Sequence, residues 1–259
     1  MRPPFANKTM LTLSLIGIGC GDPAHLTRKV VDAINAADLI LIPRKGEEKS
    51  DLADLRRQIC ADVLTNAATR VVEFDLPRRD SARENYRAGV DDWHDAVAAS
   101  WSNEIAQNLG EHGRVALLIW GDPSLYDSSL RIARRLDSLP QIEVVPGITA
   151  IQALCAAHAL PLNEIGEAFL VTTGRRLREG GWPTGVDTVV VMLDGGTAFE
   201  VLDPNGIRIW WGAYLGMPHQ IIFSGSLADV GAAIIAARRD ARERHGWIMD
   251  CYILKRGLA

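Results

Sequence analysis

Two Gly-Asp-Pro triplets stand out among the residues that could shape a ligand site. Gly21–Pro23 follows the apolar run LSLIGIGC, and Gly121–Pro123 follows the apolar run VALLIW. Glycine at the end of a buried strand lets a ligand approach the backbone closely, because no Cβ intervenes. Each triplet also suits the start of a helix, with aspartate as the cap and proline in the first turn. Taken alone, the triplets favour this helix start over a ligand site.

The first turn departs from the glycine-rich patterns that bind phosphates. Gly17 and Gly19 fit the beginning of Gly-x-Gly-x-x-Gly, but Asp22 occupies the third position, where its carboxylate would repel a pyrophosphate. The sequence also has no Gly-x-x-x-x-Gly-Lys-Ser/Thr loop. These departures argue against an NAD-dependent dehydrogenase and against an NTP-hydrolysing enzyme.

Both triplets lie where apolar runs give way to helical patterns. Strands are predicted at 11–18, 38–43, 70–74, 114–120 and 142–145, and helices at 25–37, 51–63, 81–109 and 125–138. Apolar runs that alternate with amphipathic helices indicate buried parallel strands, hence an α/β fold. The carboxyl ends of such strands are where open sheets place their ligands.

Strands outnumber helices after Pro146-Gly147, which predicts a mixed sheet and a second domain. We therefore expect a flexible extension at 1–10, an N-terminal α/β domain at 11–148 and a C-terminal α/β domain at 149–259. Two stretches rich in charge or glycine, RKGEEKSD at 44–51 and RRLREGGWPTG at 175–185, are expected to be polar loops that follow strand ends.

Composition narrows the class of protein. The 259 residues carry a net charge of −4, which provides no basic field for nucleic acid. No apolar stretch reaches membrane-spanning length and no leader pattern is present, so we expect a cytoplasmic protein without a membrane partner. The cysteines (Cys20, Cys60, Cys155 and Cys251) are dispersed, and the histidines lack metal-ligand spacing. Reduced cysteines and no metal site are therefore expected.

Three blocks in a fixed order resemble the tetrapyrrole methylase family of cobalamin and sirohaem methyltransferases. They are GIGCGDPAHLT, GDPSLYDSS and VPGITA, and the resemblance covers nearly the whole chain from Leu11. It implies two αβα domains with an active-site trough between them, S-adenosyl-L-methionine as methyl donor, and a homodimer. The segment at 42–60 resembles the branch of the family that methylates C1 of precorrin-5, a tetrapyrrole, and releases its acetyl group as acetate to give precorrin-6A.

The resemblance also assigns the residues that contact the cofactor. They are Cys20, Trp120, Gly121, Asp122, Leu125, Thr149, Ala150, Met192, Gly212 and Ala213. Many relatives have proline at the position of Cys20 and glycine at that of Trp120, so this chain departs from the pattern there. Thr149 also suits a helix N-cap, and Met192 also suits a core position.

Methyl transfer to an enamine-like carbon depends on in-line positioning and exclusion of water, so no nucleophilic triad is expected. Loss of the acetyl group requires water to attack a carbonyl, for which a general base or an oriented carboxylate is useful. Tyr126 and Asp127 are the predicted catalytic residues, whereas Asp22 and Asp122 are expected to act mainly as caps. The sequence leaves the identity of the base open.

Precorrins carry acetate and propionate side chains, which arginine and lysine bind well. Arg44, Lys45 and Arg175 are therefore the predicted substrate-binding residues, although each also suits a solvated surface. Other functions remain open at this point. One is a methylase of the same fold that acts on another macrocycle carbon, a protein or rRNA, and another is a tetrapyrrole carrier without turnover.

Overall fold

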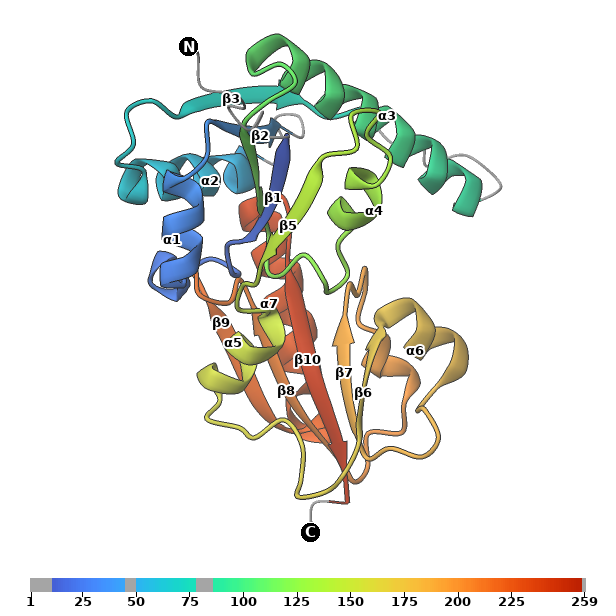
Figure 1. Ribbon diagram of the computed structural model, residues 1–259. Helices are drawn as coiled ribbons and strands as arrows, with labels where there is room; N and C mark the ends of the chain where they lie inside the picture. Colours follow the sequence, from blue (N-terminus) through green and yellow to red (C-terminus); the bar gives the residue numbers. More distant parts are fainter. Residues whose placement is uncertain (1–10, 45–49, 78–85, 258–259) are drawn as a thin grey trace, which may run out of the picture. The chain divides into compact units, whose positions relative to one another are not determined.

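The computed structural model describes residues 11–44, 50–77 and 86–257. The expected extension at 1–10 and Lys45 lie outside these residues. The chain forms two compact units (Figure 1). The first runs to Ile148 without Cys20–Asp22, and the second comprises Cys20–Asp22 together with the chain from Thr149 onward. The short segment inside the first Gly-Asp-Pro block thus belongs by its contacts to the second unit.

The first unit is built on a five-stranded parallel sheet in the order β3-β2-β4-β1-β5. Its strands are β1 (Thr12–Gly17), β2 (Leu39–Arg44), β3 (Arg70–Asp75), β4 (Arg114–Ile119) and β5 (Gln141–Val145). Its helices are α1 (Arg28–Asn35), α2 (Ser50–Val63), α3 (Tyr86–Asn108) and α4 (Ser129–Ala133). The five predicted strands and the predicted parallel α/β class are confirmed.

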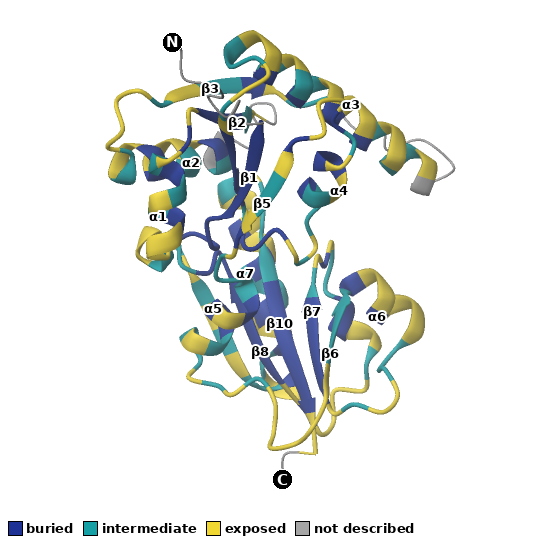
Figure 2. Ribbon diagram, viewed as in Figure 1, coloured by how far each residue is buried: buried dark blue, intermediate teal, exposed yellow. Residues whose placement is uncertain are grey.

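Residue alternation along the strands explains why both faces of this sheet are covered. Leu13 and Leu15 of β1 belong to one hydrophobic core, and Ile16 belongs to another on the opposite face. The first core receives residues of α3 and α4, and the second receives residues of α1 and α2. A parallel sheet buried on both faces requires such near-continuous apolar strands. Accordingly β1 is buried along its whole length (Figure 2).

Neither Gly-Asp-Pro triplet begins an α-helix. In the first triplet, Pro23 begins a single 3-10 turn, Pro23–His25, so the helix-start interpretation holds only for that short turn. The helix α1 begins at Arg28, and its N-cap Thr27 accepts a hydrogen bond from the backbone N–H of Val30 at 3.3 Å. After the second, α4 begins at Ser129 and ends at Ala133, so the helix predicted at 125–138 is much shorter. The residues between each triplet and its helix are therefore turn structure available to shape a site.

The second unit contains a mixed sheet in the order β6-β7-β10-β8-β9. Its strands are β6 (Phe169–Thr173), β7 (Thr188–Met192), β8 (Ile207–Ala213), β9 (Ile221–Ser226) and β10 (Asp250–Arg256). Only β6 and β7 run parallel, and the other neighbours are antiparallel. The helical segments are α5 (Ala150–Ala157), α6 (Gly174–Gly180), η3 (Ala198–Val201) and α7 (Leu227–His245). The predicted mixed sheet is confirmed.

The helix α6 falls in the stretch 175–185 that was expected to be a polar loop. Thr173 caps it by accepting a hydrogen bond from the backbone N–H of Arg176, and Leu177 anchors it in the core. Gly181, at φ 65°, ends it in the left-handed conformation that glycine favours. Glycine and charge in this stretch therefore mark a helix terminus and its exposed face.

The core of the second unit lies mainly between the sheet and the helices α6 and α7. Trp211 and Tyr214 are fully buried there, while Gly212, between them on β8, faces Leu154 of α5. The charged side chain of Lys255 is also buried, and its Nζ donates to Pro161 O at 3.0 Å and to Glu164 Oε1 at 2.9 Å. Of the helices in the described part of the chain, none combines the length and apolar character that a membrane crossing requires.

Candidate functional site

The two glycine turns of the first unit are hydrogen-bonded directly to each other. Gly19 N–H donates to Gly121 O at 3.2 Å, and Gly121 N–H donates to Gly19 O at 2.7 Å, forming an isolated antiparallel bridge. Just before it, Ile18 N–H donates to Ile119 O at 2.9 Å. The pairing of β1 with β4 thus continues past the strand ends and ties the two sequence blocks together.

A third glycine, from the VPGITA block, lies against the same bridge. A Cβ on Gly17 would lie 2.6 Å from Gly147 N and 2.8 Å from Gly121 O, and a Cβ on Gly147 would overlap the backbone of Gly17 and Gly121. Real side chains do not occupy such distances, so only glycine allows the three backbones to cross here. The structure therefore brings together the three blocks that carry the family resemblance.

Asp122 braces this crossing. Its Oδ2 accepts from Gly147 N–H at 2.9 Å, and its Oδ1 accepts from Ser124 N–H at 2.8 Å and from the Ser124 hydroxyl. Burial would raise the pKa of Asp122, but these hydrogen bonds hold it below its ordinary value. The carboxylate therefore stabilises a turn and its contact with Gly147, and it does not cap a helix as the sequence predicted.

Gly121 leaves one side of the turn open. Its φ is +66°, and a Cβ built on it would meet no atom within 4 Å apart from those of its two chain neighbours, although the residue itself is buried. Beside it, the large aromatic side chain of Trp120 is only half-buried, as is Leu125. A glycine turn next to half-buried apolar side chains can admit a ligand close to its backbone, and contact with a cofactor stays a prediction.

Tyr126 and Asp127 follow on the same turn. Tyr126 has φ 51°, uncommon for a residue with a side chain, and is 42% exposed, while burial of part of its ring raises the pKa of its hydroxyl. Asp127 Oδ1 accepts from Ser129 N–H at 2.6 Å at the start of α4. Asp127 thus has a local structural role, and a catalytic role for these two side chains stays a prediction.

Several of the expected cofactor residues of the second unit gather at one end of its sheet. Cys251 of β10 pairs with Gly212 of β8, and Met192 of β7 comes one residue beyond the Val191–Tyr252 pair on the other side of β10. The Cys251 thiol also donates to Ala150 O at 3.8 Å. Met192, Gly212 and Ala150, far apart in sequence, therefore lie close together.

Cys20–Asp22 packs against the turn that follows Ala213. A Cβ on Gly21 would lie 2.5 Å from Met217 Cγ and 3.0 Å from Leu215 O, so glycine is required here. Cys20 is buried, and burial raises the pKa of its thiol to about 11. The thiol is therefore protonated at neutral pH, and Cys20 fills space instead of acting as a nucleophile.

Thr149 is the N-cap of α5. Its hydroxyl oxygen accepts from Ile151 N–H at 3.2 Å, and the Gln152 side chain accepts from Thr149 N–H at 3.1 Å, which completes a capping box. This satisfies the structural role expected of Thr149, and contact with a cofactor stays a prediction.

The predicted substrate-binding cations have different environments. The Arg44 guanidinium at the end of β2 is paired with Asp75, with Nη2 to Oδ2 and Nε to Oδ1 both at 3.1 Å. Arg175 lies exposed on α6. Arg44 thus already has a carboxylate partner at the surface, and substrate binding by either arginine stays a prediction.

Arg56, a partly buried cation at the carboxyl end of β4, was not predicted from the sequence. Its half-buried guanidinium donates from Nε to Leu118 O at 2.8 Å and from Nη1 to Leu52 O at 2.9 Å. Burial lowers its pKa to about 10, against the attraction of Asp127. Arg56 lies four residues after Leu52 and four before Cys60, a spacing that places it on the inward face of α2.

Residues 12–231 match the model of the tetrapyrrole (corrin/porphyrin) methylases. The chain belongs to this family, whose members are S-adenosylmethionine-dependent methyltransferases. A relative from Sinorhizobium sp, named precorrin-6A synthase (deacetylating), is 44% identical over an alignment of 257 residues, and the match covers 98% of this chain and 98% of that one. The resemblance inferred from the three blocks is thereby confirmed.

Solved structures agree with this assignment. A protein from Corynebacterium diphtheriae described as related to cobalamin synthesis (CobF) has a TM-score of 0.82 and 37% identity, and the match covers 96% of this chain and 99% of that one. A uroporphyrin-III C-methyl transferase from Thermus thermophilus, complexed with S-adenyl homocysteine, has a TM-score of 0.56 and 20% identity over 94% of this chain and 97% of that one. At this lower identity the second structure supports the fold alone.

Asp122→Asn should destabilise the protein, because an amide cannot accept all the hydrogen bonds that the carboxylate accepts. We expect the free energy of unfolding at pH 7 to fall by about 1–3 kcal/mol, the usual cost of leaving buried donors unsatisfied. The folded-state pKa of Asp122 lies below its ordinary value of 3.8, so its contribution is complete above that value and is lost as pH falls through the folded-state pKa.

Urea unfolding of the wild type and of Asp122→Asn at several pH values measures this difference. Asp137→Asn, at an exposed aspartate, is the control and should leave the unfolding free energy unchanged. A constant difference down to pH 3 would contradict the role assigned to the ionised Asp122.

Proposed function

We propose that this chain is a cobalamin-pathway C-methyltransferase with the activity of precorrin-6A synthase (deacetylating). It would transfer a methyl group from S-adenosyl-L-methionine to C1 of precorrin-5 and release the acetyl group as acetate, giving precorrin-6A. The observation that carries this proposal is the near full-length match to the Sinorhizobium relative of that name. The glycine crossing and the open face of Gly121 support it, because they provide a surface for the methyl donor.

The residues present fit S-adenosylmethionine. In the first unit, the open backbone face of Gly121 with Trp120 and Leu125 would hold it, and Asp122 keeps that turn in place. In the second unit, the residues that would contact it are at or beside the sheet end described above: Cys20, Thr149, Ala150, Met192, Gly212 and Ala213. The N–H groups of Gly19 and Gly121 are both used in their mutual bridge. The turn is thus poorly suited to a phosphate, which needs a row of free N–H donors, and better suited to a ligand without phosphate.

When bound, this cofactor supplies a methyl group on a positively charged sulfur. The sulfur leaves as a neutral thioether and needs no acid catalyst. The protein's part is then to fix the direction of approach and to keep water away from the reacting carbon. A backbone crossing that only glycine permits is rigid, and rigidity of this kind favours in-line positioning.

Removal of the acetyl group makes a different demand. A water molecule must lose a proton to a base as its oxygen bonds to the acetyl carbonyl carbon. The bond from that carbon to the macrocycle then breaks, acetate leaves, and the electron pair stays on the macrocycle carbon. Tyr126 and Asp127 are the side chains proposed to orient this water. The strained backbone of Tyr126 supports a role for its exposed side chain, since strain of this kind is enriched at functional sites.

The carboxylates of the macrocycle would be bound by Arg44, Lys45 and Arg175. Exchange of the Asp75 carboxylate for that of a substrate would offset most of the gain at Arg44. We further infer, from the resemblance, that the chain acts as a homodimer in the cytoplasm. Light scattering on the purified protein in solution measures its oligomeric state directly.

The function is tested by incubating the purified protein with precorrin-5 and methyl-labelled S-adenosylmethionine. We expect one labelled methyl group in the macrocycle and one free acetate per turnover. Methylation without acetate would indicate a sibling enzyme that acts at another carbon. Binding of both ligands with neither product would indicate a carrier.

Gly121→Ala should weaken cofactor binding, because the added methyl group occupies the open face of the turn. We expect the affinity for S-adenosylhomocysteine, measured by calorimetry, to fall at least about tenfold, equivalent to about 1.4 kcal/mol. Gly110→Ala is the matched control, because Gly110 also has a positive φ, of 84°, and open space around its Cβ position. Equal affinities of the two variants would remove the Gly121 turn from the cofactor site.

Arg175→Ala should raise the KM for precorrin-5 about tenfold, since a charge-assisted hydrogen bond contributes about 1.5–3 kcal/mol. The affinity for S-adenosylhomocysteine should not change. Arg239→Ala, on the exposed surface of α7, is the control and should alter neither quantity. If the KM is unchanged, α6 does not contact the macrocycle.

A further inference from the structure

The segment that follows β7 contains a strained residue next to a buried acid. Leu193 has φ 51° and is 63% exposed, although leucine disfavours the left-handed conformation. It comes directly after Met192, one of the proposed cofactor contacts. The next residue, Asp194, has a side chain that is only 1% exposed. Strain of this kind persists only where the surroundings fix the backbone, and it marks functional segments.

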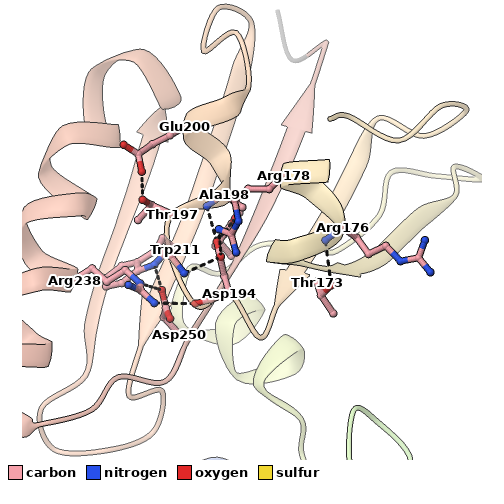
Figure 3. A network of polar contacts seen from close by, with 12 residues as sticks. Thr173, Arg176, Arg178, Asp194, Thr197, Ala198, Glu200, Trp211, Arg238 and Asp250 are labelled. Atoms are coloured by element: carbon pink, nitrogen blue, oxygen red, sulfur yellow. Dashed lines mark hydrogen bonds and ion pairs between the residues drawn. The ribbon is translucent and has the colours of Figure 1, made fainter. Parts of the chain in front are cut away.

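Four donors converge on the Asp194 carboxylate. Arg178 Nη1 and Gly196 N–H donate to Oδ1 at 2.9 and 3.1 Å, and Ala198 N–H and the Tyr252 hydroxyl donate to Oδ2 at 2.7 and 2.8 Å. They come from α6, the loop after β7, η3 and β10, as Figure 3 shows in part. A carboxylate can accept all of these bonds, whereas an amide cannot.

The backbone of Asp194 is held as well. Its carbonyl oxygen accepts from Arg238 Nη2 of α7 at 2.8 Å, and a Cβ on Gly174 would lie 2.6 Å from Asp194 Cβ. Burial would raise the pKa of Asp194, but the hydrogen bonds from Ala198, Tyr252, Gly196 and Arg178 hold it below its ordinary value. The ionised form of Asp194 is therefore favoured, and both of its carboxylate oxygens accept hydrogen bonds.

We propose that Asp194 is a positioning residue for the methyl donor, an inference that rests on the proposed function. Its carboxylate holds the Met192–Leu193 segment in the strained conformation that receives S-adenosylmethionine at the end of the second sheet. Asp194 does not touch the donor itself. Without these bonds Leu193 relaxes, and Met192 no longer presents the same surface.

The same network provides a control for a merely structural role. Asp250 is also buried, with a side chain 5% exposed, and its Oδ2 accepts from Arg238 Nε at 3.0 Å and from Trp211 Nε1 at 2.9 Å (Figure 3). Its partners lie on α7 and β8, and it makes no hydrogen bond to the loop after β7 among the bonds of the described residues. Asp250 is linked to Asp194 only through Arg238, which also donates to the Asp194 carbonyl oxygen, and not through the Asp194 carboxylate. Asp250→Asn should therefore destabilise the unit but disturb the Met192–Leu193 segment much less than Asp194→Asn does.

The test compares Asp194→Asn with Asp250→Asn in the full-length protein. For Asp194→Asn we expect the Kd for S-adenosylhomocysteine and the KM for S-adenosylmethionine to rise about tenfold, with kcat at saturating cofactor within about twofold of wild type. For Asp250→Asn we expect Tm to fall about as much as in Asp194→Asn, while the Kd for S-adenosylhomocysteine stays within about twofold of wild type. An unchanged Kd in Asp194→Asn, or equal changes in the two variants, would overturn the proposal.

A milder pair keeps the test valid should Asp194→Asn fail to fold. Arg178→Ala removes one donor to Asp194, whereas Arg176→Ala removes an exposed arginine from the same helix. The first should raise the Kd about threefold and the second should not change it. Identical Kd values would overturn the proposal. A wild type that binds no S-adenosylhomocysteine would refute the proposed function instead.

Discussion

The first unit depends on a place where three backbones cross without side chains between them. Gly19 and Gly121 exchange hydrogen bonds, and Gly17 and Gly147 leave room for Gly147 N–H to reach Asp122. Because each block of the family pattern supplies one partner, none of the three can adopt this turn alone. In this crossing the N–H groups of Gly19 and Gly121 donate to each other's carbonyl oxygens, so they are not available to bind a phosphate. The face of Gly121 beside Trp120 is where we propose that the methyl donor, which carries no phosphate, binds.

The architecture follows from the sequence because burial on both faces leaves a strong pattern. The apolar runs of β1 and β4 have no polar interruption that could be mistaken for a loop, so the parallel sheet was predictable. The starts of the helices were harder to predict than the strands. Gly-Asp-Pro satisfies the local preferences of a helix N-terminus, but the tertiary bonds of Gly121 and Asp122 prevent a helix from beginning there. The short helix α6 was missed because its exposed face and its terminal glycines resemble a loop.

The candidate site was predictable only in part, and for a physical reason. Residues such as Gly121 and Met192 came from a resemblance, which records positions without saying what holds them. The groups that hold them are buried and polar. Asp194 accepts bonds from elements spread from α6 to β10, and nothing in the local sequence around it specifies these partners. Arg56 left a weak signal, since its spacing from Leu52 and Cys60 places it on an inward helical face.

The position of β10 has a consequence for biosynthesis. This strand, formed by Asp250–Arg256, lies in the middle of the second sheet, between β7 and β8. Neither β7 nor β8 can form its hydrogen bonds to β10 before β10 has been synthesised. The second sheet therefore cannot assemble completely until residue 256 has left the ribosome. The first sheet needs nothing beyond Val145 and can assemble while translation continues. Cys20–Asp22, although made early, belongs to the later unit. During translation Cys20–Asp22 therefore lacks its native contacts until β10 has formed and the second unit has folded.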